Sequence, residues 1–133
     1  MLDLPFNHTV TIILITCIVS FIAFSKETVM NRLIFWPPAL QRGQYDRFIT
    51  HGFIHADGTH LLFNMITLFF FGSVIESFYR QYLYDLGFIL FYLGALVAAI
   101  LPSYLKHKND ARWASLGASG AVSAVLFAYI LFE

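Results

Sequence analysis

Residues 60–78 read HLLFNMITLFFFGSVIESF, an apolar run with Asn64 near its start and Glu76 near its end. This is close to the roughly 20 residues that an α-helix needs to cross the hydrocarbon core of a bilayer. The whole chain has the same character, because 59% of its 133 residues are hydrophobic and only 12% are charged. Soluble domains carry about a quarter charged residues. We therefore expect an integral membrane protein.

Three further apolar segments flank this run. The first contains residues 10–24 (VTIILITCIVSFIAF) and reaches spanning length if its helix begins near Phe6. Gly94 and Ala98, four apart in the third segment, predict the close approach of another helix. We expect an all-α polytopic transmembrane helix bundle in a single domain, with spans at about residues 6–24, 60–79, 82–104 and 115–133.

Residues 25–59 form a long first loop in which charged and aromatic side chains alternate, a mixture typical of the headgroup zone. Trp36, Pro37 and Pro38 are expected to break any helix there. The formal net charge is zero, so no basic field favours nucleic acid as a partner. Cys17 is the only cysteine and is expected to pack as a small hydrophobe. No cofactor is indicated.

Three polar residues stand where lipid should exclude them. His60 and Asn64 are four apart, so on a helix they share one face. Ser119 lies between Gly117 and Gly120, where a polar loop turns into an apolar helix whose N-terminus favours negative charge. These residues suit acyl transfer, in which Ser119 attacks and its N–H, Asn64 and His60 donate to the oxyanion. Alternatively, Ser119 is only a helix cap and Asn64 makes an interhelical hydrogen bond.

Two motifs carry a family resemblance. The stretch THGFIHADGTHLLFN, residues 50–64, resembles the second-helix motif of rhomboid intramembrane serine proteases, and GASG, residues 117–120, is similar to that family's GxSG motif. The resemblance implies that Ser119 is the nucleophile and that His60 and Asn64 help to form the oxyanion hole.

Two other residues match the family in kind. Arg47 and Glu76 resemble an arginine before the histidine cluster and an acidic residue at the far end of the second helix; alternatively each is an interfacial or snorkelling charge. His51 and His55 are interpreted as hydrogen-bonded structural histidines. A zinc site made by these two with His60 is the alternative, and we expect no metal because neither a cysteine nor an acidic cluster completes it.

The pattern departs from the family after Ser119. In the family a histidine on the sixth core helix activates the serine, whereas the histidines here are His8, His51, His55, His60 and His107. The resemblance thus implies the N-terminal four of six core helices, truncated before the general base. Since a serine without a base is a poor nucleophile, the 133-residue chain alone is expected to be inactive. Ser123 also stands where family members often have tyrosine.

The resulting hypothesis is a serine endopeptidase that cleaves peptide bonds in or near transmembrane helices, with membrane proteins as substrates and the lipid bilayer as surroundings. Two alternatives remain: a non-catalytic rhomboid-like protein that binds membrane helices, and a small transporter segment. A bacterial inner membrane is expected. Basic residues in the first and third loops would make that side cytoplasmic, whereas the family orientation, which we favour, makes it extracytoplasmic.

Overall fold

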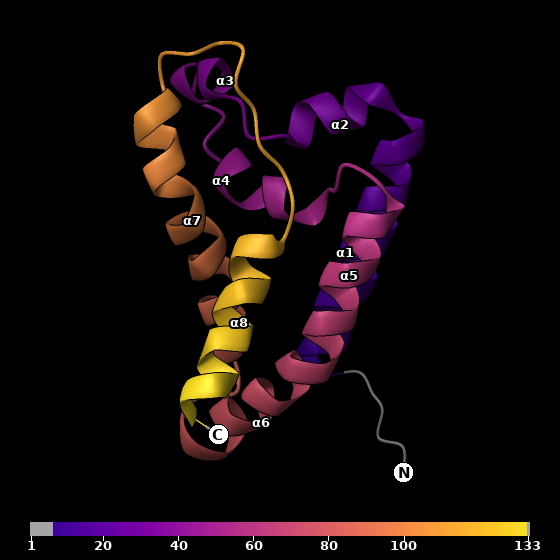
Figure 1. The fold of residues 1–133 in the computed structure, drawn as a ribbon, viewed down its shortest axis with the longest axis vertical. Helices are drawn as coiled ribbons and strands as arrows, with labels where there is room; N and C mark the ends of the chain where they lie inside the picture. The colour runs from indigo at the N-terminus through magenta and orange to yellow at the C-terminus, as the bar shows by residue number, and fades with distance from the viewer. Residues whose placement is uncertain (1–6, 133) are drawn as a thin grey trace.

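The structure, a computed structural model, describes residues 7–132, and the regular elements in that range are helices. Figure 1 shows the long helices running along the molecule with a group of short helices across one end. In chain order the elements are α1 (His8–Ser25), α2 (Glu27–Leu33), α3 (Pro37–Gln41), α4 (Arg47–Thr50), η1 (His51–Phe53), α5 (Gly58–Thr67), η2 (Leu68–Gly72), α6 (Ser73–Tyr82), α7 (Gly87–His107) and α8 (Ser119–Phe132).

Three helices are long and apolar enough to cross a membrane. They are α1 with 18 residues, the continuous helix Gly58–Tyr82 with 25 residues, and α7 with 21 residues. The middle one contains α5, the π-helical turn η2 and α6. These spans agree with the predicted all-α membrane bundle. The predicted fourth span contains α8, an apolar helix of 14 residues, which is shorter than the roughly 20 residues of a full crossing. Phe6 and Glu133, at the outer limits of two predicted spans, lie outside the described residues.

Local signals set where the spans begin. The Asn7 side chain accepts a hydrogen bond from the Val10 amide at the start of α1, and Asp57 accepts one from the His60 amide at the start of α5. These are ordinary N-caps, which stabilise a helix by satisfying its free amides. The third span was expected to end near residue 104, but α7 continues through Pro102 to His107, as membrane helices tolerate proline.

The loop between α1 and α5 is ordered into short helices that lie across one end of the bundle (Figure 1). The prediction that Trp36, Pro37 and Pro38 exclude helix is wrong, because α3 begins at Pro37. Proline fits the first turn of a helix, whose amides have no internal partner. Phe35 anchors the loop, as its ring is fully buried and packs edge to face against Phe48 and Tyr104.

Helices α7 and α8 pack together most closely at Gly120, but not at the predicted small-residue pair. A Cβ at Gly120 would overlap the Cβ of Ala99, whereas a Cβ at Gly94 would meet nothing within 4 Å. Gly94 and Ala98 are exposed. The close approach therefore uses Ala99 on α7, and the expectation for Gly94 and Ala98 is wrong within the described part of the chain.

This contrast predicts opposite effects for two alanine substitutions. Gly120→Ala should lower the free energy of unfolding by about 1–3 kcal/mol, because the helices must separate to admit the methyl group. Gly94→Ala should leave it unchanged or raise it by up to about 1 kcal/mol, since alanine favours helix. Denaturation in mixed micelles, followed by circular dichroism, measures both. Equal losses in the two variants would contradict the packing described here.

Candidate active site

Ser119 is the first residue of α8. Gly117, two residues earlier, has φ +111°, a left-handed conformation that only glycine adopts at no cost. The serine side chain is exposed and lines a cavity of about 160 Å³ together with His51, Gly117 and Gly120. The serine therefore stands at a helix N-terminus beside an open space, as the sequence predicted for a nucleophile.

The turn before Ser119 is hydrogen-bonded to the first loop. The Gly117 amide donates to the His51 carbonyl oxygen at 2.8 Å, and the Ala118 amide donates to His55 Nε2 at 3.2 Å. Further back, Phe35 and Ser115 exchange backbone hydrogen bonds of 2.9 and 3.0 Å. Residues more than sixty positions apart in the chain thus fix the place of the serine.

The contacts of His55 assign its tautomer. Ser20 Oγ donates its proton to the Phe53 carbonyl oxygen at 2.9 Å, so it accepts from His55 Nδ1 at 3.2 Å. Nε2 is then unprotonated and accepts from Ala118. Burial, together with the charge of His60, lowers the pKa of His55 to about 4. The imidazole is therefore neutral at pH 7, and both of its nitrogens are engaged.

His51 is also buried and bonded within the loop. Its Nδ1 lies 3.0 Å from the Arg47 carbonyl oxygen, and burial lowers its pKa. In the described part of the chain, the ring nitrogens of His51, His55 and His60 do not gather within metal-ligand distance of one another. His51 and His55 thus act as hydrogen-bonding residues, and in the described part of the chain they do not form a zinc site with His60.

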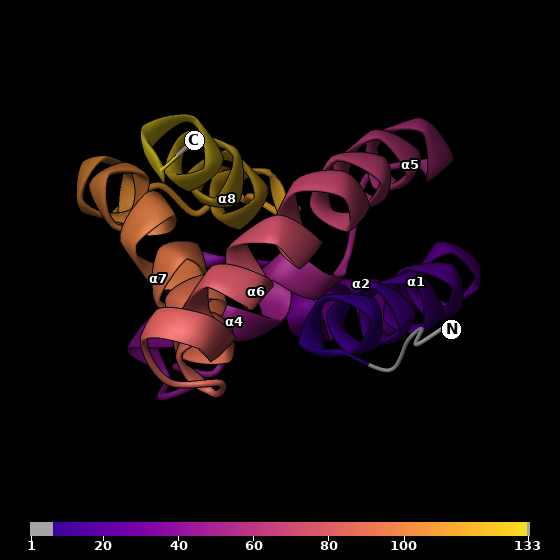
Figure 2. The ribbon, with the colours of Figure 1, turned by 90° about the horizontal axis from the view of Figure 1, so that it is seen from below.

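His60 and Asn64 lie on α5, at the same end of the bundle as Ser119. Helices α5 and α8 diverge toward this end (Figures 1 and 2). The His60 side chain is 67% exposed, with Nδ1 3.3 Å from Asp57, and Asn64 is half-buried one turn further along. Over residues 7–132 no hydrogen bond joins the Ser119 side chain to either residue. The three residues thus lie toward one end of the bundle on two different helices.

The Rhomboid domain model matches residues 42–133, a segment that holds His51, His55, His60, Asn64 and Ser119. The chain belongs to the rhomboid family. It is a multi-pass membrane protein by its spans and its family.

Curated relatives are identical to this rhomboid chain at about a third of the aligned positions. RHOMBOID-like protein 12, mitochondrial, from Arabidopsis thaliana is 34% identical over 114 residues, which cover 77% of this chain and 34% of the relative. Rhomboid protease GlpG from Salmonella choleraesuis (strain SC-B67) is 32% identical over 120 residues, covering 86% of this chain and 40% of the relative. The chain thus spans between a third and two fifths of the length of these relatives.

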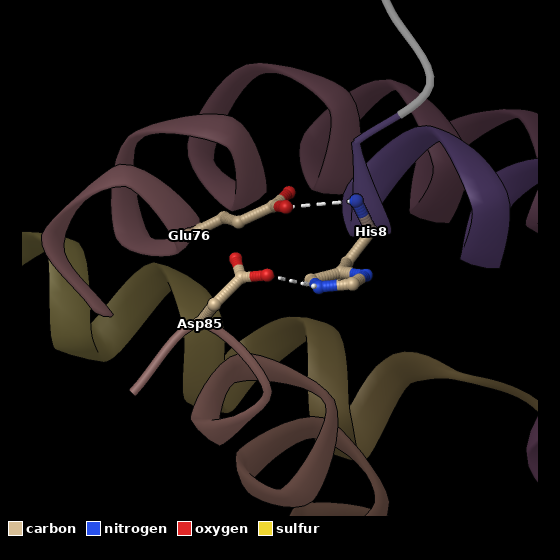
Figure 3. Close-up of side chains that lie close together, drawn as sticks. All are labelled: His8, Glu76 and Asp85. Atoms are coloured by element: carbon tan, nitrogen blue, oxygen red, sulfur yellow. Dashed lines mark hydrogen bonds and ion pairs between the residues drawn. The ribbon is translucent and has the colours of Figure 1, made fainter. Parts of the chain in front are cut away.

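Glu76 of this rhomboid chain is buried at 1% exposure, so it is not a snorkelling charge. One carboxylate oxygen accepts from the amide and the hydroxyl of Thr9, and the other accepts from the His8 amide and from Arg80, at 2.7–2.9 Å. Asp85 completes the group by contacting the His8 ring and Arg80 at 3.2 and 3.3 Å. Figure 3 shows both carboxylates directed at His8. The sequence indicated Glu76 but not these partners.

His8, Glu76 and Asp85 bring three potential metal-ligand atoms within 4.8 Å of one another. Four donors already occupy the Glu76 oxygens, and the Arg80 guanidinium contributes a positive charge beside both carboxylates. A cation would have to displace these donors, so the donor set does not suit a metal ion. The cluster instead joins the start of α1 to α6.

Glu76→Gln should destabilise the protein strongly. The glutamine side chain lacks the negative charge that pairs with Arg80 and accepts from the backbone amides of α1. Its NH₂ group would also face hydrogen-bond donors where Glu76 has an acceptor oxygen. We expect a loss of about 2–4 kcal/mol in the free energy of unfolding. Asp85→Asn is the matched control, because Asp85 is 54% exposed and exposed ion pairs contribute at most about 1 kcal/mol. Similar losses in both variants, measured by denaturation in mixed micelles, would refute the burial argument.

The lowered pKa of His55 predicts that acid destabilises the fold. The unfolded chain binds a proton near pH 6.5, whereas the folded imidazole does so only near pH 4. This stability is present above pH 6.5 and is lost as the pH falls toward 4, by about 2 kcal/mol between pH 7.5 and pH 5. His51 adds to the loss in the same direction.

Unfolding measured at pH 7.5 and at pH 5 tests this dependence, with His55→Gln as the comparison. The variant is expected to be less stable at pH 7.5 and to lose less stability on acidification. An unchanged pH dependence in His55→Gln would show that this imidazole is not the titrating group.

Proposed function

We propose that this chain carries the nucleophile of a rhomboid-type intramembrane serine endopeptidase acting on peptide bonds in or near transmembrane helices. The observation that supports it is the position of Ser119, exposed at the start of α8 beside a cavity, on a turn that His51 and His55 hold by hydrogen bonds. Membrane-embedded proteins are the proposed substrates, and a bacterial inner membrane in the family orientation is the proposed location.

In this mechanism Ser119 Oγ attacks the scissile carbonyl carbon. The Ser119 amide, at a helix N-terminus, and the side chains of Asn64 and His60 stabilise the oxyanion that forms. Because α5 and α8 diverge at this end, Asn64 and His60 would approach the oxyanion only when the substrate lies between them and Ser119. Catalytic hydrogen bonds commonly tighten only in the complex with substrate.

The proposed nucleophile needs a general base. The histidines in the described residues have other partners: His8 contacts Asp85, His51 contacts Arg47, His55 contacts Ser20 and Ala118, His60 contacts Asp57, and His107 stacks on Trp113. Over residues 7–132 none of them is hydrogen-bonded to Ser119. We therefore propose that the 133 residues alone do not catalyse proteolysis and that the base is a histidine outside them.

A chimera tests this assignment. Residues 1–133 are followed by the remaining core helices of the Salmonella GlpG protease, and the purified protein is treated with a fluorophosphonate probe that labels activated serines. We expect labelling of the chimera, none of the 133-residue chain, and none of the chimera with Ser119→Ala. Ser123→Ala, one turn further along α8, is the matched control and should be labelled. Labelling that survives Ser119→Ala, or its absence in a folded chimera, would refute the proposal.

The same chimera separates the oxyanion residues from the nucleophile. Asn64→Ala or His60→Ala should lower the turnover of a transmembrane reporter substrate by about 10²–10³ for an essential donor. Probe labelling of Ser119 should persist. A non-catalytic helix-binding protein, the second candidate, would instead retain reporter binding without Ser119-dependent cleavage in any of these variants.

A further inference from the structure

A cavity lies between the first loop and the loop before α8. It has a volume of about 600 Å³ and is lined by Asn31, Arg32, Ile34, Trp36, Arg47 and Ala114; we call it the loop cavity. Its residues come from α2, from the chain after α2, from α4 and from the loop before α8. Since α2 directly follows the end of α1, the loop cavity lies at the level where the spans reach the membrane surface (Figure 1).

Arg47 gives the loop cavity an unpaired positive charge. Its residue is 5% exposed, and it donates from Nε to Gln44 Oε1 at 2.9 Å and from one terminal nitrogen to the Ile34 carbonyl oxygen at 2.7 Å. These acceptors are neutral, and among residues 7–132 no carboxylate lies within ion-pair distance. The nearby Asp46 is paired with Arg32 at 3.0 Å. A buried charge without a counter-ion is costly, so an anion in the cavity would stabilise it.

The electrostatic surroundings favour an anion further. Burial lowers the pKa of Arg47, and the charges of Arg32 and Arg42 lower it further, whereas the charge of Asp46 raises it. Arg42 lies 5.5 Å from the centre of the Trp36 ring and adds another positive charge at the rim. Arg32, Arg42 and Arg47 thus outnumber the one carboxylate of Asp46.

An apolar hollow adjoins the loop cavity. It has a volume of about 230 Å³ and is lined by Ile15, Val19, Leu33, Thr50 and Phe53. The two linings contain neighbouring residues, because Leu33 and Ile34 are consecutive and Arg47 and Thr50 both lie on α4. Arg47 donates to the Ile34 carbonyl oxygen, and Thr50 donates to the Leu33 carbonyl oxygen at 2.9 Å. Ile15 lies ten residues before the end of α1 at Ser25, about 15 Å at 1.5 Å per residue. Ile15 and Val19 thus place this hollow beside the part of α1 that lies in the hydrocarbon layer.

We propose that the loop cavity binds the phosphate of an anionic glycerophospholipid, whose acyl chain lies in the apolar hollow against α1. An occupant that is both anionic and lipidic suits both spaces, because the charged cavity and the apolar hollow are lined by neighbouring residues of the first loop. Arg47 is the main phosphate ligand, with Asn31 able to donate from its amide. A lipid with net charge −1 neutralises Arg47, whereas a choline headgroup brings a second positive charge beside it.

Native mass spectrometry of the full chain, freed of lipid in detergent, tests the proposal. The probes are phosphatidylglycerol and phosphatidylcholine with the same acyl chains. We expect one retained phosphatidylglycerol, with phosphatidylcholine retained about tenfold more weakly, the change typical of one charge-assisted hydrogen bond. Equal retention of both lipids would overturn the anionic assignment. Inorganic phosphate that displaces phosphatidylglycerol at equal concentration would overturn the role of the hollow.

Three variants locate the site. Arg47→Gln and Ala114→Leu should each weaken phosphatidylglycerol retention about tenfold, the first by removing the charge and the second by filling the loop cavity. Arg112→Gln is the control for charge, because its side chain is 95% exposed, and it should retain the lipid. If Arg47→Gln unfolds in a thermal melt, Ala114→Leu decides, since it leaves the hydrogen bonds of Arg47 intact. Undiminished retention in Ala114→Leu would refute the site.

Discussion

The arrangement of the candidate site depends on the neutral imidazole of His55. Its Nδ1 donates to Ser20 on α1, and its Nε2 accepts from the amide of Ala118, next to Ser119. One ring therefore joins a membrane span, the first loop and the serine turn. Protonation would place a second N–H group on Nε2, facing the N–H of Ala118 and breaking their hydrogen bond. Burial keeps the ring unprotonated at neutral pH. A hydrophobic residue could fill the same space, but it would leave the buried amide without an acceptor.

Much of the fold could be predicted from the sequence because lipid leaves few alternatives. A backbone in hydrocarbon must satisfy its own hydrogen bonds, so apolar runs such as the one after Gly58 have to be helices. The ordering of the first loop was harder to predict. It depends on Phe35, whose ring packs against partners as distant as Tyr104, and on the fact that Pro37 begins a helix instead of preventing one. No local pattern encodes a contact across 69 positions.

The candidate site, like the fold, could be predicted only in part. The motifs indicated Ser119, Asn64 and His60, and the structure places all three at one end of the bundle, but the divergence of α5 from α8 is a property of packing that spacing cannot predict (Figure 2). The partners of Glu76 and His55 were also missed, although the sequence held a signal. Thr9 and Ser20 lie about three helical turns apart on the apolar α1 and are fully buried, so their hydroxyls have to meet polar groups elsewhere.

The first loop also links the serine turn to the membrane surface through very few hydrogen bonds. Arg47 lines the loop cavity with its side chain, and its carbonyl oxygen accepts from His51. The carbonyl oxygen of His51 in turn accepts from Gly117, two residues before Ser119. Because α4 has only four residues and continues directly into η1, these contacts belong to one short continuous segment. An anion bound at Arg47 would therefore stabilise the same backbone that holds the serine turn.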